Sequence, residues 1–318
     1  MTEINMRYAA VVVTFNRKRL LVEALNSLLK QTIPPVKIVV IDNHSTDGTP
    51  DELHRAGLDQ NPLVEIHRLP ENIGGSGGFN EGVRLAAQLP DVGWLALSDD
   101  DAIYEPAYFE KLALAQRRHP DIQAFSGNVM LTDGRIQSDQ RGVVSNEYWV
   151  KKSLLPASAF EGVAETTIDW FSFCGCVFAT ALVAKVGLPE KDYFIWWDDF
   201  EYSLRLRQHT KLLNINDAQV IHKTAIPSMD TIAKYQRDWR TYYNVRNKVL
   251  TMKRHGKSSL VTGLYLTYWY PRLMTTIIQS KFAGNRHFVF NQYNAGFWDG
   301  VRGRGGKSLV HLPGSESH

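Results

Sequence analysis

"YAAVVVTFNRKRLLVEALNSLLKQTIPPVKIVVID" occupies residues 8–42 and decides the fold class. Its first eight residues form an apolar run rich in valine, which predicts a buried strand over 8–15. Apolar residues then recur at helical spacing over 18–31, and a second apolar run predicts a strand over 37–42. A strand, a helix and another fully apolar strand in this order are typical of a βαβ unit with parallel strands.

The same alternation continues along the chain and predicts an α/β fold with a doubly wound, mainly parallel sheet. Further strands are expected at 64–70, 93–101, 122–131, 170–180 and 212–223, and helices at 81–89 and from Asp199 onward. Ligands in such sheets bind beyond the carboxyl ends of the strands. We therefore expect the functional residues of this chain among the polar residues that follow its strands.

The composition is that of an ordinary folded protein, with 318 residues, 44% hydrophobic and 22% charged. The only two cysteines, Cys174 and Cys176, are separated by one residue. A disulfide between such near neighbours in a strand has poor geometry, so we expect two small core residues and a reducing compartment. The N-terminus runs directly into a short strand pattern without an apolar signal region, which favours a cytoplasmic protein.

Positive charge is concentrated in the last part of the chain. From Lys234 to the end there are 14 lysines and arginines against three acids, a balance of +11, so the first 233 residues carry −8 of the total of +3. This part includes "LYLTYWYPRLMTTII" (264–278), which is too interrupted to span a membrane but suits the headgroup layer. We expect a catalytic domain over 1–228 and a helical, basic, aromatic region over 229–318 that binds the inner-membrane surface.

Three adjacent aspartates end the strand predicted at 93–101. Such a cluster is costly unless a cation or well-placed donors neutralise it. Alternate residues of an extended segment point the same way, so Asp99 and Asp101 are candidates to share one divalent ion, while Asp100 faces elsewhere. The alternative is a simple acidic turn before the helix that begins near Pro106.

Two other segments follow predicted strands. "ENIGGSGGFNEG" (71–82) contains glycines that let the backbone approach a ligand or turn amides toward an anion, although a flexible turn is the alternative. It has neither the ending of a P-loop nor the spacing of a dinucleotide fingerprint. Asp42 ends the strand at 37–42, where its carboxylate could accept from a nucleobase or a ribose hydroxyl, whereas the alternative of a plain cap or turn residue fits Asp47 better than Asp42.

"IWWDDFEYSLRLR" (195–207) places two tryptophans before an acidic helix start. Asp198 and Glu201 have the spacing of a capping box, and Glu201 can also pair with Arg205 at i+4. Trp196 and Trp197 are expected either in the core or as a stacking surface for a sugar ring, with Trp197 preferred for the sugar.

Together, "VVVTFNR…VVIDNHSTDGT…ENIGGSGGFNEG…LSDDD…WWDDFEYSLRLR…IHK" resembles the family 2 glycosyltransferases with the GT-A fold. The nearest likeness is to the bacterial galactofuranosyltransferases, followed by the related rhamnosyltransferases. It covers roughly residues 8–225 and extends more faintly over 242–256. The resemblance implies a nucleotide-binding half over 1–101 and an acceptor half over 102–228.

The resemblance also implies roles for individual residues. Asp199 would be the catalytic base. The nucleotide-sugar would contact Thr14, Arg17, Asp42, Asn72, Gly75 and Asp100. Mn²⁺ or Mg²⁺ would bind Asp99, Asp101 and His222, a mixed oxygen and nitrogen set, although a histidine after a strand is more often structural. The acceptor would contact Trp196, Trp197 and Asp198.

The expected function is inverting transfer of galactofuranose from its UDP donor to a hydroxyl of a lipid-linked or polysaccharide glycan of the cell envelope, such as O-antigen. The enzyme would act as a peripheral protein on the cytoplasmic face of the inner membrane. The first alternative is transfer of rhamnose from dTDP-rhamnose. A nucleic-acid-binding protein fits less well, because acids at the strand ends would repel phosphates without a metal. A glycan-binding protein without activity is the remaining alternative.

Overall fold

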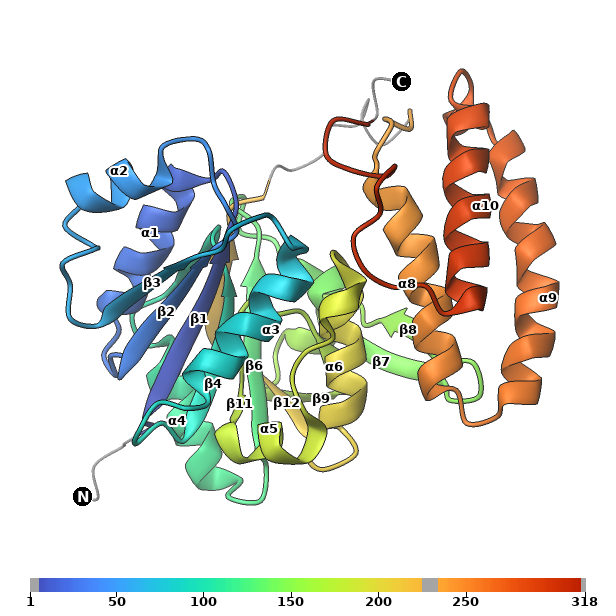
Figure 1. Cartoon of the computed structure of the whole chain (residues 1–318). Coiled ribbons are helices and arrows are strands. Elements are labelled where there is room, and N and C mark those ends of the chain that lie inside the picture. Colours follow the sequence, from blue (N-terminus) through green and yellow to red (C-terminus); the bar gives the residue numbers. More distant parts are fainter. Residues whose placement is uncertain (1–5, 225–233, 316–318) are drawn as a thin grey trace. The chain divides into compact units, whose positions relative to one another are not determined.

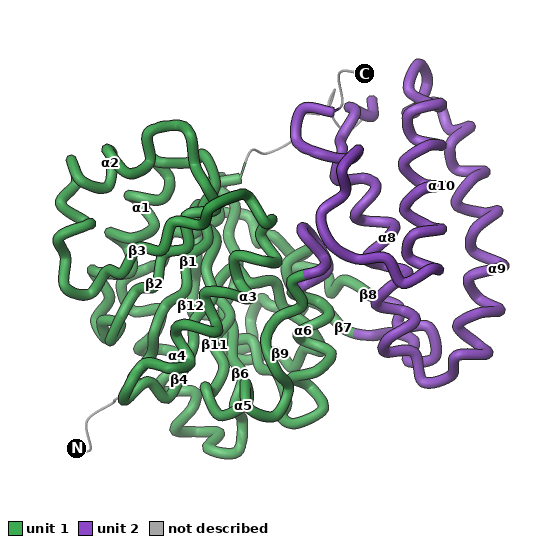
Figure 2. Tube along the Cα trace, in the orientation of Figure 1, with its two compact units in different colours: residues 1–143, 153–191, 199–224 green, residues 144–152, 192–198, 225–318 purple. Residues whose placement is uncertain are grey.

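The computed structural model describes residues 6–224 and 234–315, which form two compact units (Figure 2). Unit 1 contains residues 1–143, 153–191 and 199–224, and unit 2 contains 144–152, 192–198 and 225–318. The expected boundary between residues 228 and 229 lies outside the described residues. Unit 2 also includes two short segments, 144–152 and 192–198, that precede the expected boundary in the sequence.

Unit 1 is built on a nine-stranded mixed sheet (Figure 1). Its first half has the order β3-β2-β1-β4, all parallel, with bounds β1 Tyr8–Thr14, β2 Lys37–Asp42, β3 Val64–Arg68 and β4 Trp94–Asp99. This confirms the doubly wound arrangement, because β1 lies at the centre and the chain moves outward to β3 before crossing to β4. The carboxyl ends of these four strands share one edge of the sheet.

The second half of the sheet mixes directions. It continues through β11 Cys176–Ala179, β6 Ala124–Met130, β12 Leu212–His222 and β5 Ala102–Tyr104, with β9 Glu165–Ile168 also pairing to β12. Strand β11 is antiparallel to both neighbours, and β12 is parallel to β6 but antiparallel to β5. A smaller sheet has the order β10-β7-β8, with bounds β10 Trp170–Phe171, β7 Arg141–Asn146 and β8 Lys151–Leu154.

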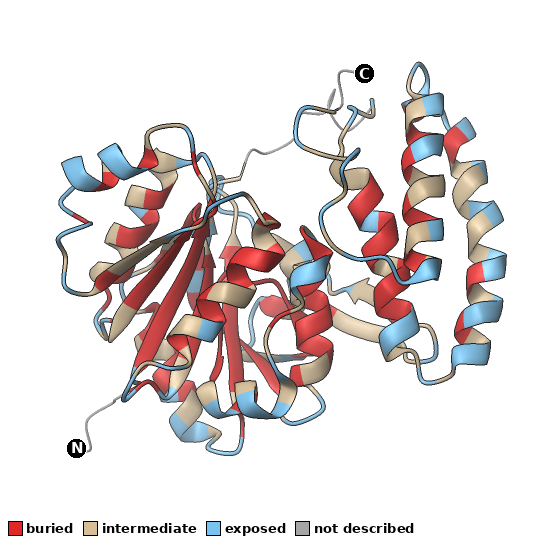
Figure 3. Ribbon diagram, in the orientation of Figure 1, coloured by how far each residue is buried: buried red, intermediate tan, exposed pale blue. Residues whose placement is uncertain are grey.

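Helices cover both faces of the large sheet, because the side chains of β1 alternate between two apolar clusters. On one face lie α1 Lys18–Leu29, α2 Thr49–Arg55 and α4 Tyr108–Arg118, and on the other α3 Gly74–Ala86, α5 Thr180–Val186 and α6 Asp198–Leu206. The central strands between these layers, β1, β2, β4, β6 and β11, are almost completely buried (Figure 3). Short 3₁₀ turns occur at Ser138–Gln140, Ala157–Phe160, Lys191–Tyr193, Thr276–Ile278 and Ser280–Phe282.

The helix predicted at 81–89 begins earlier than expected. Helix α3 starts at Gly74, so the glycine-rich segment is helical and the turn alternative is wrong. A Cβ on Gly82 would lie 2.3 Å from Val11 Cγ1, and one on Gly78 would lie 2.6 Å from Val13 Cγ1. These glycines let α3 approach β1 closely. From the sequence alone, they were expected to allow a close approach of the backbone to a ligand. A Cβ added to Gly75 would meet no atom within 4 Å, so this position has room for a ligand.

The strand predicted over 170–180 is interrupted. Gly175 adopts φ +82°, a left-handed conformation that favours glycine, and separates β10 from β11. Cys174 and Cys176 on either side of it are free and fully buried in different apolar clusters. The expectation of two small core residues is confirmed.

Unit 2 has its own apolar core between α8 Arg240–His255, α9 Ser259–Thr275 and α10 Arg286–Arg302. Helices α8 and α10 approach closely at Gly296 and Gly300, where an added Cβ would meet Tyr242 O at 2.5 Å and Val249 Cβ at 2.6 Å. The expected helical character of this region is confirmed. None of the helices within 6–224 and 234–315 has the length and apolar character needed to cross a bilayer.

Candidate active site

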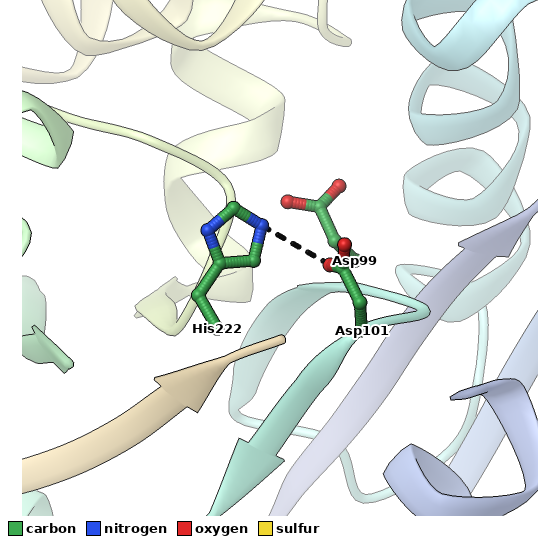
Figure 4. Close-up of side chains that lie close together, drawn as sticks. All are labelled: Asp99, Asp101 and His222. Carbon is green, nitrogen blue, oxygen red and sulfur yellow. Dashed lines mark ion pairs between the residues drawn. The ribbon is translucent and has the colours of Figure 1, made fainter. Parts of the chain in front are cut away.

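Asp99, Asp101 and His222 meet at the edge of the large sheet (Figure 4). Asp99 ends β4, and Asp101 directly precedes β5. Strand β12 pairs with β5 so that its last residue, His222, lies opposite Ala102. This register brings His222 Nε2 to 3.1 Å from Asp101 Oδ1, and the ligand atoms of all three side chains lie within 4.8 Å of one another.

The donor set fits a divalent cation. His222 Nδ1 lies 2.8 Å from the amide oxygen of Gln137, which only accepts, so Nδ1 carries a hydrogen, and in the neutral imidazole the lone pair is on Nε2, which faces the acids. Asp101 Oδ1 is buried and accepts no hydrogen bond from the described residues despite its closeness to Nε2. Two carboxylates and one imidazole suit Mn²⁺ or Mg²⁺.

Arg17 and Thr14 hold the neighbouring carboxylate. Asp100 accepts a hydrogen bond from Thr14 Oγ1 at 2.7 Å and one from Arg17 Nη1 at 3.3 Å. The same Arg17 nitrogen lies 2.5 Å from Asp101 Oδ2. Two separate sequence motifs are therefore in direct contact, Thr14 and Arg17 of "TFNR" with Asp100 and Asp101 of "LSDDD", and one guanidinium bridges two acids.

The electrostatics of the cluster follow from burial and crowding. Burial raises the pKa of Asp99 to about 7, with Asp101 adding to the effect and His222 opposing it. Burial also raises the pKa of Asp100 to about 6, although Arg17 opposes this. For Asp101 burial is outweighed by His222 and Arg17, which hold its pKa below the usual range. Acids this crowded favour either protons or a bound cation.

The pKa of His222 is shifted in the direction opposite to a simple buried histidine. Burial alone would lower it, but the close contact with the Asp101 carboxylate, together with the charge of Asp99, raises it above the ordinary value. A cation at this site would have to displace that proton, since a metal ligand needs the neutral imidazole.

Asp42, Asn72 and Gly75 lie along the same edge of the sheet. Asp42 ends β2 beside Thr14, accepts from Ser45 N at 2.8 Å and lies 3.7 Å from the Arg68 guanidinium. Asn72 accepts from the backbone N–H of Gly74 at 2.8 Å and thereby shapes the start of α3. The structure supports a turn role for Asp42 and leaves its nucleotide role a prediction.

Asp199 lies in the first turn of α6 and is half-buried. Its Oδ1 accepts from Phe200 N at 2.6 Å. Burial raises the pKa of the Cys176 thiol, and the charges of Asp199 and Asp99 raise it further. The expected pair between Glu201 and Arg205 is confirmed at 2.7 Å.

The loop over 192–198 carries the three predicted acceptor residues and belongs to unit 2. Trp196 and Trp197 adopt φ +63° and +74°, which is rare for bulky residues and signals a strained backbone. Trp197 donates through Nε1 to Asn244 at 2.7 Å, whereas Trp196 is 40% exposed and lines a cavity. Of the two tryptophans, Trp196 is the one that lines this cavity, and the role of either residue toward a sugar stays a prediction. Asp198 is buried.

Helix α8 holds this loop through residues that sequence reasoning missed. Asn247 Nδ2 lies 2.9 Å from the carbonyl oxygens of Tyr193, Ile195 and Trp196. Arg246 Nη2 donates to Tyr193 O at 2.9 Å. Asn247 is fully buried, and a polar residue at apolar helical spacing is the signal that could have identified it. Gln137 was missed because nothing in its sequence context marks it as a partner of His222.

Comparison with known proteins gives the same family that the sequence motifs resemble. Residues 9–164 match the family model described as "Glycosyl transferase family 2". The chain is 26% identical over 279 residues to galactofuranosyltransferase GlfT1 of Mycobacterium tuberculosis, covering 84% of this chain and 88% of that protein. It is 24% identical to the N-acetylglucosaminyl-diphospho-decaprenol L-rhamnosyltransferase of the same species, over 68% of this chain and 75% of that one.

Solved structures support the fold. GalNAc-T7 with UDP, GalNAc and Mn²⁺ aligns with a TM-score of 0.63 at 15% identity, over 94% of this chain and 57% of that chain. Residues 1–349 of Staphylococcus aureus TarS with UDP-GlcNAc align with a TM-score of 0.56 at 16% identity, over 94% and 82%. From the family match, these relatives and the fold, the chain is a glycosyltransferase of family 2 with a GT-A fold.

Proposed function

We propose that this chain transfers a sugar from a UDP-sugar, with inversion and with a divalent metal, to a hydroxyl of a lipid-linked glycan. The observation that carries the proposal is the convergence of Asp99, Asp101 and His222 at the carboxyl edge of the sheet. A divalent cation held by these three side chains would supply charge stabilisation for a departing diphosphate. The donor is proposed to be UDP-galactofuranose, which the named function of the GlfT1 relative supports.

The residues around the cluster have distinct proposed roles. Arg17, which lies on Asp101 and Asp100, provides a guanidinium for the diphosphate oxygens. Asp42, Asn72 and Gly75 would hold the nucleoside and its phosphates along the same edge. Asp199 would take the proton of the acceptor hydroxyl as it attacks the anomeric carbon, because a carboxylate in that position can act as general base.

Transfer of rhamnose from dTDP-rhamnose is the second candidate, and the rhamnosyltransferase relative favours it. Both candidates use the same metal cluster and base, so they differ only in the donor pocket. The donor nucleotide distinguishes them directly.

Binding to the cytoplasmic surface of the inner membrane is part of the proposal and concerns unit 2. Helix α9 exposes Leu260 by 72% and Leu264 by 63%. A separate, mainly apolar cavity of about 480 Å³ lies among α8, α9 and α10, and its lining includes Leu266, Phe297 and Lys253. Apolar side chains beside lysine and arginine suit an anionic lipid surface.

A donor screen tests the proposal. The protein is incubated with Mn²⁺ and single nucleotide sugars, and nucleotide release is followed with and without a lipid-linked acceptor. We expect release from UDP-galactofuranose that depends on both metal and acceptor. Release from dTDP-rhamnose alone would select the second candidate. No metal-dependent turnover of any UDP- or dTDP-sugar would overturn both.

A further inference from the structure

A cavity of about 460 Å³ lies within unit 2, and its lining shares no residue with the metal cluster of unit 1. Its lining combines aromatic, amide and cationic side chains, among them Trp196, Lys234, Tyr235, Asn244, Lys281 and Tyr293. Ligand sites of this size hold small molecules, and a mixed lining of aromatic rings and polar groups indicates a polar ligand with flat apolar faces. A sugar ring has this character.

One wall of the cavity is a tryptophan held in place. The carbonyl of Trp196 accepts from Asn247 Nδ2 at 2.9 Å, which fixes the left-handed backbone that presents the indole. The Arg240 guanidinium lies 5.0 Å from the centre of its ring. Asn244 uses Oδ1 to accept from Trp197, so the NH₂ of its amide remains as a donor toward a ligand.

The charges of the cavity do not balance. Among the residues that line the cavity, Asp238 is the one with a carboxylate. Arg240 Nη2 forms an ion pair with Asp238 Oδ2 at 2.9 Å. Within residues 6–224 and 234–315, no carboxylate forms an ion pair with Lys234 or Lys281, and both side chains are exposed. Two ammonium groups that have no acidic partner among the described residues, beside aromatic rings, favour a ligand that carries negative charge.

We propose that this cavity binds the phosphorylated end of the acceptor, with a sugar ring on Trp196 and its phosphate on Lys234 and Lys281. The proposal rests on the proposed function, since it takes the acceptor to be a glycan joined to its carrier through phosphate. A neutral saccharide would use the indole and the Asn244 amide but would leave both ammonium groups without a partner. The ligand class is therefore a glycosyl phosphate or diphosphate.

The test is a calorimetric titration of the full chain with N-acetylglucosamine 1-phosphate, methyl N-acetylglucosaminide and inorganic phosphate, in the presence of Mn²⁺ and UDP and again in EDTA without UDP. We expect the sugar phosphate to bind more tightly than either fragment in both conditions. The double variant Lys234→Gln/Lys281→Gln should weaken it roughly tenfold while leaving the methyl glycoside unchanged. Trp196→Ala should weaken both sugars but not inorganic phosphate.

Lys211→Gln, an exposed lysine of unit 1, is the matched control and should change nothing. Equal binding of sugar phosphate and inorganic phosphate, loss of binding when UDP is present, or indifference to the double lysine variant would each overturn the subsite. These measurements need no turnover. A failed donor screen with intact binding would overturn the proposed activity alone, and turnover with unaffected binding in the variants would overturn the subsite alone.

Discussion

Asp199 is the residue on which the proposed chemistry depends. The contacts and burial of the two neighbouring acids differ from those of Asp199. Glu201 is committed to Arg205, and Asp198 is buried within unit 2. Asp199 is half-buried in unit 1, where its charge reaches the same buried thiol as that of Asp99. We therefore propose Asp199, rather than either neighbour, as the group that takes the proton of the acceptor hydroxyl.

Replacing Asp199 by Asn should abolish transfer while leaving UDP binding nearly intact. Loss of a general base lowers kcat by about 10²–10⁴-fold. Asp101→Asn should weaken both transfer and UDP binding in Mn²⁺, because it removes a metal ligand. Nucleotide release and calorimetric titration with UDP measure the two effects. If Asp199→Asn lowered only thermal stability, the carboxylate would be a helix cap.

Affinity for Mn²⁺ should depend on pH with a known sign. Asp99 has its pKa raised to about 7 by burial, and the pKa of His222 is raised by Asp101. Both must lose a proton to bind the metal, so apparent affinity rises with pH through 7 and falls below it. Deprotonation of Asp99, with its pKa of about 7, by itself predicts a loss of roughly tenfold between pH 8 and pH 6, and the proton displaced from His222 enlarges this loss. Titration with Mn²⁺ at both values checks this, and equal affinities would contradict it.

Among the elements, helix α8 contributes to the apolar core of unit 2 and also holds the tryptophan loop over 192–198. Its buried Arg246 and Asn247 bind the carbonyls of a loop in which Phe194, Trp196 and Trp197 all have positive φ. Such a backbone persists only where surrounding contacts hold it. We infer that α8 fixes the orientation of the tryptophan that faces the cavity.

Asn247→Ala should raise the KM for the acceptor severalfold. It should leave unchanged the rate at which the nucleotide sugar is hydrolysed by water in the absence of an acceptor. Carbonyls that lose a buried donor cost about 1–3 kcal/mol of stability, so the thermal midpoint should also fall. Asn291→Ala on α10 is the matched control, because Asn291 is exposed. A fall in stability with an unchanged acceptor KM would show that Asn247 has only a structural role.

At the scale of the whole molecule, the uneven charge has a testable consequence. The part from Lys234 onward carries +11, and helix α9 within it exposes Leu260 and Leu264. The protein should therefore co-sediment with vesicles containing phosphatidylglycerol but not with purely zwitterionic vesicles, and salt should weaken the binding.

Leu260→Ser/Leu264→Ser should reduce this vesicle binding, since both side chains would enter the headgroup layer. Leu114→Ser provides the control, because Leu114 is 37% exposed on unit 1. Equal binding to both kinds of vesicle, or no effect of the α9 variant, would contradict a membrane role for this helix.

The sequence by itself determined the doubly wound half of the sheet, because apolar runs and helical spacing are local patterns that do not depend on distant residues. It also predicted Asp99, Asp101 and His222 as a set, through alternation along a strand and resemblance to a family. Only the tertiary structure decided that α3 begins at Gly74, since the fit of Gly82 against Val11 is a contact between separate elements. It likewise decided the partnerships of Gln137 with His222 and of Asn247 with the tryptophan loop, because these side chains are far apart in the chain and meet only when strands and helices are packed.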